Sequence, residues 1–213
     1  MIDRISRLLG GTLALMLAAA LAAPGAAQAQ AGDNGTPEVA VTGDIQVDGR
    51  ATVGSWDCQV TDFDGDVELA DGVEGMADIT IENLGDAVSD LTMKVSAAMN
   101  CDDGDDMDEY SREALEVEDH PTVDFEMDDY RVVEVEDGEA RIDLRGTMTI
   151  SGTDRPVTIP VTVAPENGGL AVTGSFELDM TEYDVDPPRM MLGTIRVRSD
   201  VEISFDLFVE EAR

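Results

Sequence analysis

The sequence predicts an all-β fold of about eight antiparallel strands, arranged as a sandwich or a closed barrel. Apolar and polar residues alternate with a period of two along most of the chain, as in strands that bury one face. Turn signals, such as Asp-Gly at 137–138 and Asn-Gly-Gly at 167–169, separate the alternating segments in the way that hairpins require. A single segment has helical spacing, so we expect one short helical excursion from the sheet.

Each expected strand has apolar residues at every second position and polar residues between them. In the segment 140–150, for example, Leu144 and Met148 share one face. Pro160 has no backbone donor, so we expect an edge, a bulge or a strained corner within 157–163. The expected strands cover residues 45–53, 63–69, a short piece at 79–81, 91–99, 123–135, 140–150, 157–163, 172–180 and 195–207.

The helical segment lies between two of these strands. Residues 106–116 place Met107, Ala114 and Leu115 at helical spacing, which predicts an amphipathic helix. Pro121 follows shortly afterwards and cannot continue a helix, so we expect the helix to end before it.

The N-terminal residues 1–29 have the pattern of a secretory signal peptide. Arg4 and Arg7 precede an apolar run at 8–23, and Ala-Gln-Ala at 27–29 is typical of a cleavage site. An uncleaved membrane anchor is the alternative, but the apolar run is short for a membrane span. We therefore expect a periplasmic or secreted protein without stable membrane insertion.

Residues 30–43 are rich in Gly, Pro and small polar residues and lack a period, so we interpret them as a flexible leader. The folded domain is expected to cover residues 44–213. The sequence does not distinguish a monomer from a homodimer.

The chain is strongly acidic, with a formal net charge of −34 and Lys94 as its one lysine. This charge excludes nucleic-acid binding, which needs Lys and Arg against phosphates, and predicts repulsion from anionic lipid headgroups. Disorder would be one explanation of the charge, but the hydrophobic fraction of 43% and the alternation oppose it. We favour adaptation to high salt, because molar salt shortens the Debye length to about 3 Å and screens the acids from one another.

The residues that carry chemistry are too few for an active site. His120 is the single histidine, so neither a His-rich zinc site nor a catalytic triad can be assembled around it, and a structural role at the helix exit is favoured. The acidic runs at 62–66 and 102–106 do not match the twelve-residue calcium loop, although a weak Ca²⁺ site there is an alternative interpretation. We predict no enzyme activity, no cofactor and no metal.

Cys58 and Cys101 both lie in the part of the chain expected to be exported. An even number of cysteines in an oxidising compartment favours a disulfide between them, and two free buried thiols are the alternative.

Three segments make the sequence resemble a known family. Residues 111–127, 145–163 and 172–207 are similar to the YceI-like family, and the pattern G-x-M-x-I-x-G-x-x-R-P-V at 146–157 is one of three specific parts. The resemblance extends from about Ile45 to Val209. It departs from the family in the first hairpin, where the usual histidine is absent.

The resemblance implies a lipocalin-like, eight-stranded β-barrel of a secreted bacterial protein that holds a polyisoprenoid or a similar long apolar lipid. It also implies that the segment before the last strand is a loop at the barrel mouth, where Met190, Met191 and Leu192 either cover the opening or belong to an ordinary hairpin loop. A packed structural or stress-related module without ligand is the alternative function, and a quinone-type ligand is a further one. The residues that the family fold implies as tunnel lining are Val123, Phe125, Leu144, Met148, Ile150, Phe176, Leu178, Met180, Ile203 and Phe205.

Overall fold

The computed structural model describes residues 39–101 and 105–212 of the 213-residue chain. The predicted signal peptide lies outside the described residues, as does the leader up to residue 38. Residues 39–43, which the sequence pattern assigned to the leader, already form the start of a strand. The strand begins earlier than expected because Val39 and Val41, which precede Ile45 in the chain, continue its alternation. Val39 is buried, and Val41 lines the interior of the sheet.

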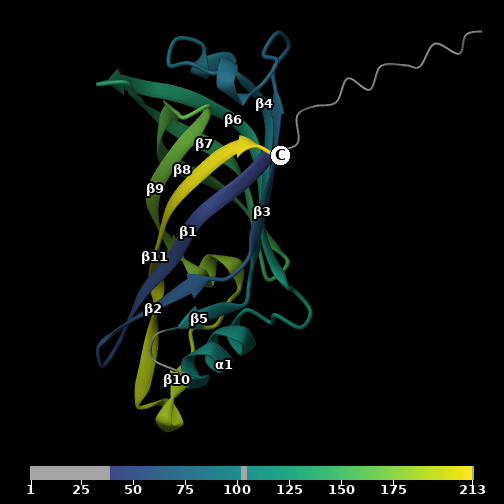
Figure 1. The fold of residues 1–213 in the computed structure, drawn as a ribbon. Helices are drawn as coiled ribbons and strands as arrows, with labels where there is room; N and C mark the ends of the chain where they lie inside the picture. The colour runs from purple at the N-terminus through teal and green to yellow at the C-terminus, as the bar shows by residue number, and fades with distance from the viewer. Residues whose placement is uncertain (1–38, 102–104, 213) are drawn as a thin grey trace, which may run out of the picture. The chain divides into compact units, whose positions relative to one another are not determined.

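The eleven strands of the described residues belong to one antiparallel sheet (Figure 1). Their order is β3-β4-β6-β7-β8-β9-β11-β1-β2-β5, and β10 pairs with β11 beside this path. One continuous sheet excludes a sandwich of two separate sheets. The strands are β1 (Val39–Ala51), β2 (Ser55–Val60), β3 (Phe63–Leu69), β4 (Val88–Ser96), β5 (Met99–Cys101), β6 (Thr122–Glu136), β7 (Glu139–Ile150), β8 (Thr153–Glu166), β9 (Gly169–Asp179), β10 (Arg189–Met190) and β11 (Ile195–Glu211).

The sheet curls until β3 lies next to β1, but it does not close into the predicted eight-stranded barrel. A Cβ atom added to Gly65 of β3 would lie 3.0 Å from Cγ2 of Val41 of β1. No hydrogen-bonded ladder joins these two strands in the described parts of the chain. The fold is therefore an all-β curled sheet, and its edges meet through side chains.

The strand count also differs from the expected eight. Strands β5 and β10 have only 3 and 2 residues, so alternation alone does not reveal them. The 6-residue strand β2 does alternate, with Trp56, Cys58 and Val60 buried, but it was not predicted as a separate strand. The short strand expected at 79–81 is absent, because Ile79 follows the 3-10 turn η1 (Met76–Asp78) and is buried from there.

Pro160 lies where strands β8 and β9 separate. The β8–β9 ladder starts at the pair Val161–Gly174, whereas Pro160 pairs only with Asp143 of β7. The missing N–H of Pro160 thus faces no ladder partner, as the edge prediction requires.

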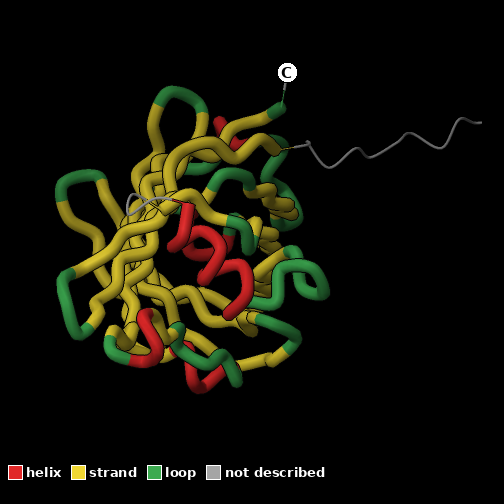
Figure 2. Tube along the Cα trace, turned by 90° about the horizontal axis from the view of Figure 1, so that it is seen from below, coloured by secondary structure: helices red, strands yellow, loops and turns green. Residues whose placement is uncertain are grey.

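The expected helix is present as α1 (Asp105–Ala114), and it lies across one end of the space that the strands enclose (Figure 2). Met107 and Ser111 are the buried residues of this helix. The chain leaves the helix through Glu116, whose φ of 51° is left-handed. The helix therefore covers one end of the curled sheet.

A disulfide joins two strands at this end of the sheet, next to the helix. Cys58 of β2 and Cys101 of β5 form the predicted bond, and they are direct partners in the β2–β5 ladder. The backbone N–H of Cys101 also donates to Oδ1 of Asp108 in α1, at 2.7 Å. The disulfide prediction is confirmed, and the bond fixes the strand from which the helix departs.

The opposite end is filled by the turns η1 and η2 (Leu84–Asp86) and is held by one tyrosine (Figure 1). The hydroxyl of Tyr130 donates to the Leu84 carbonyl at 2.8 Å and accepts from the N–H groups of Ala87 and Val88 at 3.1 Å. Met76, Leu84 and Ala87 are buried beneath these turns.

Candidate ligand-binding cavity

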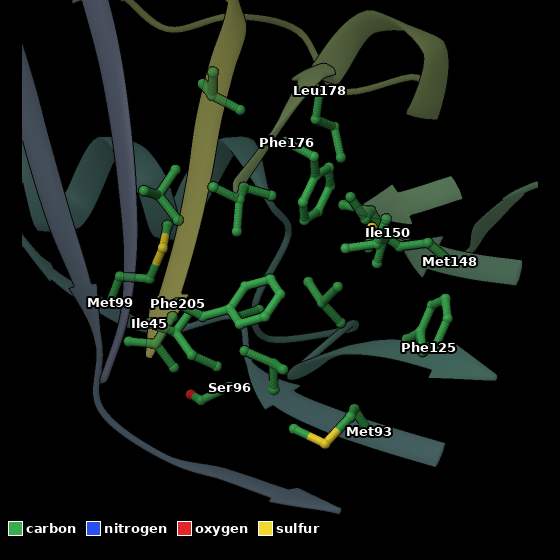
Figure 3. Close-up of a pocket in the computed structure, with 18 of the residues that line it drawn as sticks. Ile45, Met93, Ser96, Met99, Phe125, Met148, Ile150, Phe176, Leu178 and Phe205 are labelled. Atoms are coloured by element: carbon green, nitrogen blue, oxygen red, sulfur yellow. The ribbon is translucent and has the colours of Figure 1, made fainter. Parts of the chain in front are cut away.

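The curled sheet encloses an apolar cavity of about 270 Å³ (Figure 3). Apart from Ser96 and Ser111, every residue that lines it is apolar. Protein interiors rarely contain voids larger than a water molecule, and a cavity needs a volume of only about 10–15 Å³ to hold one water molecule. The interior is therefore an open space and is not filled by its own side chains.

Strand pairing explains why the lining is so uniform. Inward-facing residues are direct partners in neighbouring strands, as in the pairs Ile45–Phe205 and Ile203–Phe176. Because side chains alternate between the two faces of a strand, each such pair repeats two residues further along. The apolar face of every long strand thus contributes to one continuous wall.

All ten residues that the sequence pointed to as tunnel lining border this cavity, and they come from β6, β7, β9, η3 (Met180–Tyr183) and β11. Their contact with a ligand stays a prediction. They are Val123, Phe125, Leu144, Met148, Ile150, Phe176, Leu178, Met180, Ile203 and Phe205.

Sequence reasoning missed the part of the lining that comes from β1, β2, β3, β4, β5, β8 and α1. Ile45 and Met93 were detectable, because both lie on the apolar faces of expected strands. Trp56 was detectable as well, because it alternates with Cys58 and Val60, but β2 was not predicted as a separate strand. Met107 and Leu115 were assigned to the helix, but only the fold places them over the cavity.

Glycines in the strands keep two aromatic rings close to the wall. A Cβ atom added to Gly146 would lie 2.7 Å from Cε2 and Cζ of Phe125. A Cβ atom added to Gly174 would overlap Cζ of its strand partner Phe205 in the same way. Each ring therefore occupies the place of a side chain on the neighbouring strand, which leaves the centre of the cavity free.

Methionines make the cavity lining adaptable in shape. Met93, Met99, Met107, Met148 and Met180 all border the cavity. Their unbranched, polarizable side chains adapt to irregular apolar shapes, and this suits an interior that accepts a flexible guest.

The two serines of the lining are already engaged within the protein. Ser96 Oγ donates to the Ala98 carbonyl and accepts from the Ala98 N–H, both at 3.2 Å. Ser111 Oγ donates to the Asp108 carbonyl at 2.9 Å. Trp56 Nε1 is buried and has no hydrogen-bond partner among the described residues. No charged side chain lines the cavity, so its wall favours hydrocarbon over charged guests.

The titratable residues Asp179, Tyr183 and His120 are not part of the cavity lining. Asp179 accepts hydrogen bonds from Oγ1 and N–H of Thr181, at 2.6 and 2.9 Å, and these bonds lower the pKa of Asp179. Burial raises the pKa of Tyr183 above its usual range. The ring of His120 lies against Gly152 in the β7–β8 turn, and the backbone N–H of His120 donates to the Glu116 carbonyl at 2.8 Å.

The described residues contain no group of three or more His, Cys, Asp or Glu side chains placed to hold a metal ion. Part of the acidic run at 102–106 lies outside them. No helix in the described ranges is long and apolar enough to cross a membrane.

The loop before β11 only partly covers the cavity. Val185 and Pro188 line it, and Met190 packs against the core. Met191 and Leu192, in contrast, are 74% and 108% exposed, so these two residues do not cover an opening. Their left-handed backbone, with φ of 48° and 59°, directs the side chains into solvent.

Both the sequence and the structure resemble those of known proteins. The YceI-like domain profile matches residues 40–209. BcnA from Burkholderia cenocepacia has a similar structure, with 16% identity and a TM-score of 0.54, over 78% of this chain and 95% of BcnA. A polyisoprenoid-binding domain from Saccharophagus degradans, implicated in plant cell wall breakdown, has 10% identity and a TM-score of 0.57, over 83% of this chain and 99% of that domain.

The YCEI protein of Campylobacter jejuni is a further structural relative, with 11% identity and a TM-score of 0.50, over 73% of this chain and 85% of that protein. At these identities the likeness concerns the fold alone. No curated protein matches the sequence.

Proposed function

Because the chain belongs to the YceI-like domain family, we propose that it is an exported, non-enzymatic carrier that holds a polyisoprenoid or a similar long apolar lipid in the cavity. The observation that carries the proposal is the cavity itself, which has about 270 Å³ of open space and a wall without charged side chains. The Saccharophagus degradans relative, which is a polyisoprenoid-binding domain, has the same fold.

The physical driving force for such a ligand is large. Each CH₂ group that leaves water for an apolar site contributes about 0.8 kcal/mol. Several isoprene units therefore supply a gross gain well above the translational and ordering losses of binding. The wall supplies this gain along its whole length and needs no buried charge to do so.

The disulfide and the predicted signal peptide together support an extracytoplasmic location. Disulfides such as Cys58–Cys101 form and persist in oxidising compartments. The net charge of −34 supports an environment of high ionic strength, where the acids are screened from one another. We infer a periplasmic or secreted carrier from a salt-adapted bacterium.

The alternative of a packed, ligand-free module is weakened by the open cavity. A quinone-type ligand would occupy the same space as a polyprenol, with its isoprenoid tail along the same wall. Both ligands are therefore included in the test of the proposal.

The test is a displacement titration with a fluorescent apolar probe, in which a polyprenol and a long-tailed quinone compete for the cavity. Phe176→Trp adds bulk to the wall, and Leu178→Arg places a charge at a position that is 8% exposed. Val133→Ser, at an exposed position outside this cavity, is the matched control. We expect both wall variants to lose uptake of the probe and the control to keep it.

Leu178→Arg risks misfolding because it buries a charge, so Phe176→Trp is the decisive variant. A folded Phe176→Trp protein with unchanged uptake of probe and polyprenol would refute the assignment of the cavity.

A further inference from the structure

Two acid-free segments of this acidic chain together contain four arginines. The chain has 47 Asp and Glu among 213 residues, yet residues 49–56 and 187–199 have none. The same two segments contain Arg50, Arg189, Arg196 and Arg198. We call these two segments together the basic tip.

The two segments of the basic tip are adjacent in space, at the end of the sheet that α1 covers (Figure 1). The Thr52 N–H donates to the Arg196 carbonyl at 2.9 Å, and the Arg196 N–H donates to Oγ1 of Thr52 at 3.2 Å. The β1–β2 turn therefore lies directly against the start of β11. The four arginines form one local positive surface on a protein of opposite charge.

The arginine side chains of the basic tip contribute little to the fold. Within the described residues, the side chain of Arg196 donates one hydrogen bond, from Nε to the Gly193 carbonyl at 3.3 Å. Arg189 and Arg196 are direct partners in the β10–β11 ladder, and like charges in this position destabilise a sheet. None of the four arginines forms an ion pair with a carboxylate in the described part of the chain, although carboxylates pair with Arg131 and Arg145 elsewhere. Acidic residues begin again at Asp48, Asp57, Asp186 and Asp200, so the positive charge is confined to the tip itself.

Exposed apolar side chains lie within the same surface. Val53, Met191 and Leu192 are 71%, 74% and 108% exposed. Met191 and Leu192 also have left-handed backbone conformations, which are costly for residues with large side chains. The fold therefore tolerates backbone strain at the point where it presents two large apolar side chains to the solvent.

We propose that the basic tip docks on the surface of a lipid bilayer that contains anionic headgroups. Arginine guanidinium groups bind phosphates in a bidentate manner, and Met191 and Leu192 insert at the boundary between headgroups and acyl chains. The Debye length is about 8 Å at physiological ionic strength and about 3 Å at molar salt, so the repulsion between the remaining acids and the headgroups falls as salt rises. Arginines in direct contact with phosphates are screened much less.

This inference deepens the proposed function and rests on it. Two residues near the start of the basic tip line the cavity. Val185 lies two residues before the segment 187–199, and Pro188 lies within it. A molecule docked through the tip would place this end of the cavity next to the membrane, where an apolar lipid is taken up or delivered.

The test is co-sedimentation with vesicles of phosphatidylcholine that contain phosphatidylglycerol, compared with vesicles of phosphatidylcholine alone. A basic residue near an anionic surface contributes about a fivefold gain in binding, so Arg189→Gln with Arg196→Gln should weaken binding roughly 25-fold. Arg131→Gln, at an exposed arginine outside the tip, is the matched control and should bind normally. Equal binding of wild type to both kinds of vesicle, or no binding at all, would overturn the proposal, as would normal binding by the double variant.

Leu192→Gly separates docking from folding. Glycine adopts a φ of 59° without strain, so this variant should melt at a higher temperature than wild type while it loses binding to anionic vesicles. A merely structural role of Leu192 would change both properties in the same direction, and unchanged vesicle binding by the variant would count against the proposal.

Organic extracts of the same samples keep the two proposals apart. Tip variants should retain the lipid content of wild type, since the cavity is untouched. If the wild type binds anionic vesicles but neither carries nor takes up a lipid, the carrier function fails and docking stands. If it carries lipid but does not bind vesicles, docking fails and the carrier function stands.

Discussion

Removal of the Cys58–Cys101 disulfide should destabilise the domain by about 4 kcal/mol. The two cysteines are 43 residues apart in sequence, and the chain-entropy model gives roughly this value for a loop of that length. In a domain of this size, each kcal/mol lowers the melting temperature by about 2–4 °C. We therefore expect the melting temperature to fall by roughly 8–16 °C.

The same perturbation should affect ligand exchange, because the bond holds the covered end of the cavity. Cys101 ends β5, immediately before the chain passes to α1, and Met107 and Ser111 of this helix line the cavity. Without the disulfide, Cys101 is still paired with β2 and bonded to Asp108, but the helix is less firmly fixed. A bound apolar probe should leave the reduced protein faster than the oxidised protein.

The assay is scanning calorimetry of wild type with and without reductant, together with the double variant Cys58→Ala/Cys101→Ala. The double variant avoids an unpaired thiol, and reductant should not change its melting temperature. Dissociation of the probe is measured by stopped flow on the same samples. Equal melting temperatures for oxidised and reduced wild type would refute the entropic reasoning, and equal dissociation rates would refute the link to the helix.

Three further predictions follow from other contacts. Gly174→Val should push the ring of Phe205 into the cavity and reduce probe uptake, whereas Gly85→Ala, where the atom nearest to the added Cβ is 3.8 Å away, should leave uptake unchanged. Tyr130→Phe leaves the N–H groups of Ala87 and Val88 without their acceptor and should cost about 2–3 kcal/mol in urea unfolding, so an unchanged midpoint would show that the hydroxyl bonds contribute nothing. Circular dichroism across a salt titration should show unfolding in dilute buffer and folding at molar salt, and full stability in dilute buffer would exclude salt adaptation.

The cavity wall could be predicted from sequence because alternation is a local property. Residues such as Phe176 and Leu178 are two positions apart, so any strand that contains them places both on one face. The closure of the sheet is not local. It depends on how β3 meets β1, and side-chain packing around Gly65 decides this without any hydrogen-bonded register.

The basic tip shows a second limit of sequence reasoning. Nothing in the residue types of Met191 and Leu192 predicts left-handed backbone, which opposes their conformational preference. From the sequence, a segment that covers the cavity and an ordinary hairpin loop were therefore equally expected for these residues. The absence of acids from 187–199 was visible in the sequence, but its meaning required the β1–β2 turn to lie beside it.

The carrier proposal is tested most directly by mass spectrometry of an organic extract of the purified protein. The proposal predicts a long isoprenoid or similar apolar lipid at about one molecule per chain, or its stoichiometric uptake when a polyprenol is added to delipidated protein. An extract without lipid, together with no uptake of added polyprenol by correctly folded protein, would contradict it.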